Sequence, residues 1–65
     1  MIKVFSFDVY WTKPGRSGSY SGRKRVKVFS KSVTDARELA KAKAASEVEI
    51  EMSFPAGSVR IGRVI

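Results

Sequence analysis

Basic side chains crowd into one short stretch of this chain, and their types and spacing suit contact with phosphate groups. Residues 1–31 hold eight Lys or Arg and one acid, Asp8, whereas residues 32–65 hold five bases and five acids. Lys and Arg neutralise phosphates and release their counterions, which supplies affinity without reading sequence. The asymmetry predicts an anionic partner, most commonly nucleic acid. The candidate nucleic-acid-binding residues are Lys13, Arg16, Tyr20, Arg23, Lys24, Arg25 and Lys27.

Aromatic residues lie among these bases and offer a second kind of contact. Tyr10, Tyr20, Phe29 and Trp11 could stack on the bases of a single strand, although a core position explains Trp11 better. A two-stranded β-ribbon could instead enter the major groove of a duplex. The pattern leaves DNA and RNA open, and likewise single and double strands. The plain alternative is a solvated charged face that keeps a small protein soluble.

Residues that enzymes use for proton transfer and nucleophilic attack are scarce. The chain has no histidine and no cysteine, and it contains no nucleophile elbow or phosphate-binding loop. Glu47, Glu49 and Glu51 alternate, but on a strand such carboxylates lie about 7 Å apart. That spacing is too wide to chelate one ion without other ligands. We therefore expect no enzymatic activity, no metal and no other cofactor.

Length and composition indicate one small domain over residues 1–65. The hydrophobic fraction of 43% is ordinary for a folded protein, and the lack of cysteine excludes a disulfide framework. A core this small often relies on tight packing or self-association, so a homodimer stays open. No stretch matches the about 20 apolar residues of a membrane span, and the N-terminus lacks a secretory cleavage pattern. An intracellular, cytoplasmic protein is expected.

Two strands that pair as an antiparallel ribbon are predicted to carry the basic stretch. Residues 2–12 and 23–31 are rich in β-branched and aromatic side chains. Between them, residues 13–22 hold three glycines, three serines and a proline, which predicts a mobile loop. Alternation places the apolar residues of both strands on one face and leaves a basic face outside. The apolar set is Phe5, Phe7, Val9, Trp11, Val26 and Val28.

A helix is predicted over residues 33–45, which contain strong helix formers and no glycine or proline. Ser32 precedes it, and Asp35 follows three residues later, which is the spacing of a capping box. The expected buried stripe is slim and rich in alanine, so the helix could approach a sheet closely. It consists of Val33, Ala36, Leu39, Ala40 and Ala44.

Residues 47–54 fit two structures. Val48, Ile50, Met52 and Phe54 alternate with three glutamates and Ser53, which favours a strand. No glycine or proline separates the segment from the helix, however, so a longer helix stays open. As a strand, its acids could face Arg25 and Lys27. The last strand is predicted over residues 58–65. The expected fold is α+β: an N-terminal antiparallel β-ribbon, one helix packed on the sheet, and a C-terminal strand or hairpin (ββαβ or ββαββ).

The order of ribbon, basic loop and helix over residues 2–45 loosely resembles the three-stranded sheet-plus-helix modules with which some integrases and plant transcription factors read a major groove. Those modules place three strands before the helix, whereas this sequence predicts two. Small size, basic charge and the lack of catalytic residues also resemble accessory proteins of phages and plasmids. Neither resemblance assigns a role to a residue.

Together these patterns predict a non-enzymatic, basic nucleic-acid-binding protein, in which the ribbon and loop contact mainly the phosphate backbone. The alternative is a small protein-interaction module, an inhibitor or adaptor that docks on an acidic partner surface. A protein interface usually centres on an apolar or aromatic anchor. Exposure of Tyr10, Phe29 or Trp11 would therefore favour the alternative.

Overall fold

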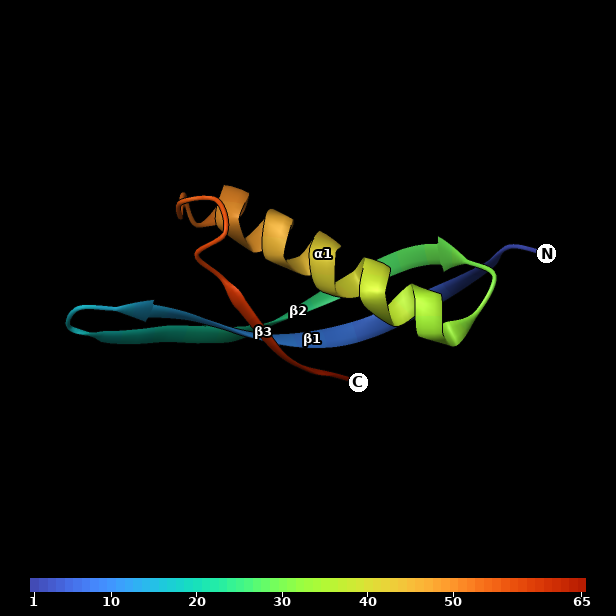
Figure 1. The fold of residues 1–65 in the computed structure, drawn as a ribbon, viewed down its shortest axis with the longest axis horizontal. Coiled ribbons are helices and arrows are strands. Elements are labelled where there is room, and N and C mark those ends of the chain that lie inside the picture. Colours follow the sequence, from blue (N-terminus) through green and yellow to red (C-terminus); the bar gives the residue numbers. More distant parts are fainter.

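A long β-hairpin crossed on one side by a single helix makes up most of the molecule (Figure 1). The computed structural model describes all residues 1–65. The sheet is antiparallel, with the order β2-β1-β3, so the predicted α+β class is confirmed in its ββαβ form. The molecule is elongated, with extents of 46 × 18 × 14 Å. Its elements are β1 (Lys3–Gly15), β2 (Gly18–Ser30), α1 (Val33–Glu51) and β3 (Arg60–Val64).

The two long strands of the hairpin are joined by a turn of only two residues, Arg16 and Ser17. The prediction of a mobile loop over residues 13–22 is therefore wrong, because the ladder continues to the Gly15–Gly18 pair. Gly18 has φ 131°, a backbone conformation that glycine adopts without steric cost. A composition rich in glycine, serine and proline indicated a loop, but in this protein it forms the narrow end of a hairpin.

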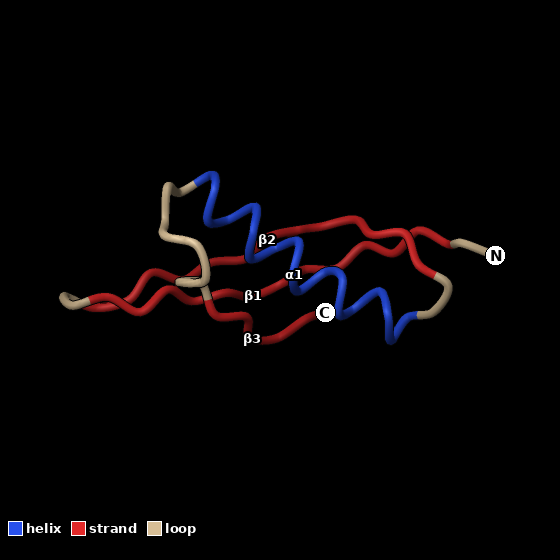
Figure 2. Tube along the Cα trace, turned by 45° about the horizontal axis from the view of Figure 1, so that its top comes forward, coloured by secondary structure: helices blue, strands red, loops and turns tan.

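Proline is tolerated in this hairpin because β3 is short. Backbone hydrogen bonds join Asp8 to Ile65, and the pairing of β1 with β3 ends at the Thr12–Arg60 pair. Figure 2 shows that β3 runs beside only part of β1, so the hairpin end is two strands wide. The backbone nitrogen of Pro14 lies on this unpaired side, where its missing N–H breaks no ladder bond.

One face of the hairpin and one stripe of α1 form the core. Alternation directs Phe7, Val9 and Trp11 of β1 toward the helix, as predicted. The facing stripe of α1 consists mostly of alanine, and such small side chains allow the helix to lie close to the strands. This stripe consists of Ala36, Ala40, Ala44 and Val48, all fully or almost fully buried. Val33 and Leu39 were expected in the stripe, but both are half-exposed at its margin.

The segment 47–54 is not a strand, so the preference for one is wrong. Helix α1 runs on to Glu51 because Val48 extends the buried stripe by one further step of four residues. Ile50, which a strand would have buried, is 75% exposed. Ser53 then adopts a positive φ of 57°, and the amide of Phe54 donates to the carbonyl of Glu49 at 2.8 Å, which ends the helix.

At its other end the helix begins as predicted. The Oγ of Ser32 accepts a hydrogen bond from the amide of Asp35 at 3.2 Å, which satisfies one of the unpaired first-turn donors. The amide of Ser32 donates to the Oγ of Ser30. Helix α1 does not combine the length and the apolar composition that crossing a membrane requires.

The close contact between the alanine stripe of α1 and the sheet leads to a prediction about stability. Ala40→Leu should lower the free energy of unfolding by about 1–3 kcal/mol, because Ala40 is completely buried and a larger side chain must displace the strands. Ala42→Leu, on the exposed side of the same helix, serves as the matched control. Urea denaturation followed by circular dichroism measures both. Equal midpoints for the two variants would contradict a close contact between Ala40 and the strands.

Candidate functional site

Folding separates the charges of this chain between its helix and its sheet. Helix α1 holds five of the six acids, whereas ten of the thirteen Lys and Arg residues lie outside it. The second half of the sequence is neutral as a whole, but β3 adds Arg60 and Arg63 to the sheet. The basic surface is therefore larger than the sequence predicted, because the antiparallel pairing of β1 and β3 joins two distant segments.

The sheet has one surface turned away from α1, and we call it the open face. Residues paired directly across two antiparallel strands share a face, so the register assigns each side chain to one side. On β2 the open face carries Arg23, Arg25 and Lys27, and on β3 it carries Arg60. The central strand contributes Val4, Ser6, Asp8, Tyr10 and Thr12 to this face.

An ion pair lies at the middle of the open face. The Nε of Arg25 donates to Oδ1 of Asp8 at 2.9 Å, and Nη2 lies 3.5 Å from Oδ2. This hydrogen bond from Arg25 holds the pKa of Asp8 below its ordinary value, with desolvation opposing it and the charge of nearby Arg23 adding to it. Asp8 is thereby satisfied, while the Arg25 side chain stays 76% exposed and accessible to a further anion.

Lys24 lies on the opposite side of the sheet, toward the helix. Its Nζ is 2.6 Å from Oε1 of Glu51, and this hydrogen bond raises the pKa of Lys24. The acids of 47–51 were expected to face Arg25 and Lys27 if that segment were a strand. That expectation is wrong, because the acids lie on α1, on the other side of the sheet. Lys24 is therefore partly neutralised within the fold, whereas Arg23 and Lys27 have no acidic partner within 4 Å.

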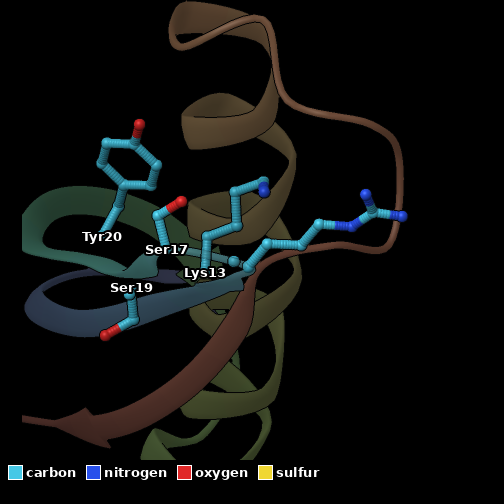
Figure 3. Close-up of a pocket in the computed structure, with 7 residues that line it drawn as sticks. Lys13, Ser17, Ser19 and Tyr20 are labelled. Carbon is cyan, nitrogen blue, oxygen red and sulfur yellow. The ribbon is translucent and has the colours of Figure 1, made fainter.

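The end of the hairpin is braced by a residue that the sequence analysis placed on the apolar face of a strand and not among the candidate site residues. Phe54, in the loop after α1, lies against Tyr20 with ring centroids 5.6 Å apart, and Nζ of Lys13 is 5.1 Å from its centroid. The Trp11 ring meets Phe54 edge-on at 6.2 Å. Lys13 and Tyr20 are opposite each other in the ladder. They point to the same side of the hairpin in Figure 3, whereas Ser19 points to the other.

The seven predicted site residues thus fall into three groups. Arg23, Arg25 and Lys27 share the open face. Arg16 is exposed at the hairpin turn, where it lines a pocket together with Lys13, Tyr20 and the small residues of the turn (Figure 3). Lys13, Tyr20 and Lys24 face the helix side. No group of three His, Cys, Asp or Glu side chains gathers anywhere to hold a metal ion.

Comparison of the chain with protein-family models, curated proteins and solved structures finds no match. The arrangement of the side chains is therefore the basis for any functional argument. The chain also departs from the sheet-plus-helix modules that its sequence resembles, because two strands precede its helix and one follows.

The Asp8–Arg25 pair makes a prediction about pH. Because the folded-state pKa of Asp8 lies below its ordinary value of 3.8, the pair stabilises the fold fully above that pH. This contribution is lost as the pH falls through the lowered pKa. Arg25→Gln should move the pKa of Asp8 back up, as measured by ¹³C NMR titration of the carboxyl group. Lys41→Gln, on the helix, should leave it unchanged; equal pKa values in wild type and Arg25→Gln would contradict the ion pair.

The brace at the hairpin end makes a prediction about dynamics. Phe54→Ala should speed amide hydrogen exchange in residues 13–20 by about fivefold, since an aromatic contact of this kind stabilises by about 1 kcal/mol. Exchange in residues 5–9, at the far half of the hairpin, should rise less. Phe54→Tyr keeps the ring and should keep the protection. A uniform change along the whole hairpin would show that Phe54 supports the core and not its end.

Proposed function

We propose that this protein is a non-enzymatic nucleic-acid-binding protein that contacts phosphates with its open face and its hairpin turn. One observation carries the proposal: the open face presents a row of cations, and its single acid, Asp8, is already paired. Arg16 extends the basic surface to the hairpin turn. Neutralising phosphates with such side chains supplies affinity that is independent of sequence.

The row has a spacing that suits a linear polyanion. Arg23, Arg25 and Lys27 alternate along β2, so their Cα atoms repeat at about 6.8 Å. Arg60 lies two strands away, at about 10 Å across the sheet. A phosphate backbone running along β2 would meet one cation after another, while Arg60 contacts it from the side. Because none of these groups must reach a base edge, specificity for sequence should be weak.

The acidic helix favours one orientation of binding. Helix α1 carries five acids against three bases, Arg37, Lys41 and Lys43, and its excess of negative charge disfavours a polyanion on the side opposite the open face. The resulting charge separation steers an approaching nucleic acid toward the sheet. This reasoning supports the open face, and not the whole surface, as the contact area.

The second candidate function is docking on an acidic protein. Exposed aromatic residues were expected to favour this alternative, and Phe29 and Tyr10 are 70% and 38% exposed on the open face, whereas Trp11 is buried. Phe29 lies directly opposite the exposed Val4, and this pair could serve as the apolar anchor of a protein interface. Addition of a partner strand to the edge of β2 is less favoured. The Nζ of Lys43 donates a hydrogen bond at 2.7 Å to the carbonyl of Lys27, which a partner strand would otherwise use.

Titration of labelled oligonucleotides at several salt concentrations, followed by fluorescence anisotropy, tests the proposal. We expect log affinity to fall linearly with log salt concentration. Lys27→Gln and Arg23→Gln should each reduce that slope by about one, because each removes a phosphate contact. Lys41→Gln removes the same charge from the helix and is the matched control.

Two results would contradict the proposal. The first is an absence of binding to single-stranded and duplex oligonucleotides at low salt, which would favour the protein-docking candidate. The second is an equal loss of affinity from Lys27→Gln and Lys41→Gln, which would show that net charge, and not the open face, attracts the oligonucleotide.

A further inference from the structure

Two aromatic side chains on the open face have no partner in the fold. The chain has seven aromatic residues. Five of them make aromatic pairs, Phe5 with Phe7 and both Trp11 and Tyr20 with Phe54. Tyr10 and Phe29 make none, and they are 38% and 70% exposed. The hydroxyl of Tyr10 also makes no hydrogen bond within the protein.

Two cations of the open face, Arg25 and Lys27, lie between these two rings. Tyr10 is opposite Arg23, and Phe29 is opposite Val4, six residues away along β1. The rings are thus about 20 Å apart along the sheet. The two ladder pairs of this face that lie between them are Asp8–Arg25 and Ser6–Lys27. The order along the sheet is an aromatic ring, the cations Arg25 and Lys27 with Asp8 paired to Arg25, and a second aromatic ring.

This order matches a single strand better than a duplex. In a duplex each base is stacked on its neighbours, so an aromatic side chain reaches a base face only after unstacking, which costs a few kcal/mol per step. In a single strand the base faces are available, and stacking on aromatic side chains adds to phosphate contacts. Burial under a base would also remove Phe29 from water.

We infer that the open face binds single-stranded nucleic acid, with bases stacked on Tyr10 and Phe29 and the intervening phosphates on Arg25 and Lys27. This inference rests on the proposed function and adds the strand form and the stacking residues to it. Every base has a face that can stack, so binding tolerates many sequences. The site spans the about 20 Å between the two rings.

The experiment separates bases from phosphates. Three labelled probes of equal length are compared by fluorescence anisotropy at one low salt concentration: oligo-dT, a fully abasic strand, and a duplex. An oligo-U probe tests whether the sugar matters. The abasic strand keeps the phosphates and lacks the rings that stack. We expect oligo-dT to bind at least tenfold more tightly than the abasic strand and more tightly than the duplex.

Conservative variants assign the difference to the two rings. Tyr10→Ile and Phe29→Ile introduce a β-branched residue, which suits a strand but cannot stack, so each should weaken oligo-dT binding by about tenfold. Neither should change binding of the abasic strand. Tyr10→Phe and Phe29→Tyr retain a ring and should retain affinity. Far-ultraviolet circular dichroism confirms that each variant folds.

The outcomes distinguish this inference from the function on which it rests. If the abasic strand or the duplex binds as tightly as oligo-dT, or if the isoleucine variants bind oligo-dT like the wild type, the stacking inference is wrong and phosphate binding by the open face stands. If no probe binds, the proposed function fails, and the stacking inference fails with it.

Discussion

Burial of only one face of the hairpin is the constraint on which the rest of this structure depends. A single helix covers the strands, and its alanine stripe lets the two backbones approach closely. Apolar side chains on the covered face, such as Val9 and Val28, supply the core. Because side chains alternate along a strand, covering one face necessarily leaves the intervening residues on the other face exposed. The open face is therefore a direct consequence of how the core is made.

The division between a covered and an open side of the hairpin also separates acidic from basic residues. Acids gather on the helix, and most bases lie on the strands and the hairpin turn, so the fold turns a difference between two halves of the sequence into a difference between two sides of the molecule. Two contacts limit the positive charge: Asp8 pairs with Arg25 on the open face, and Glu51 pairs with Lys24 on the covered side. Arg23, Lys27 and Arg60 remain without an acidic partner, and they determine where a polyanion would be drawn.

Two local errors of sequence reasoning have the same physical origin. Residues 47–54 alternate with the period of a strand, yet the same residues place Val48 four positions after Ala44, which suits the helix. Residues 13–22 have the composition of a loop, yet Pro14 fits the hairpin because β3 stops short of it. In both segments the local pattern allowed two answers, and contacts with residues distant in the sequence decided between them.

The sequence by itself determined that two N-terminal strands form a ribbon, where the helix starts and which residues share each strand face, because alternation and the Ser32 cap are local properties. Alternation also separated Lys24 from Arg23 and Arg25, which share the other face. Tertiary structure decided which distant residues join them: Glu51 pairs with Lys24, Phe54 contacts Lys13 and Tyr20 on the covered side, and β3 adds Arg60. The physical reason is that pairing between strands and the position of the helix depend on contacts across the whole chain, which no local pattern contains.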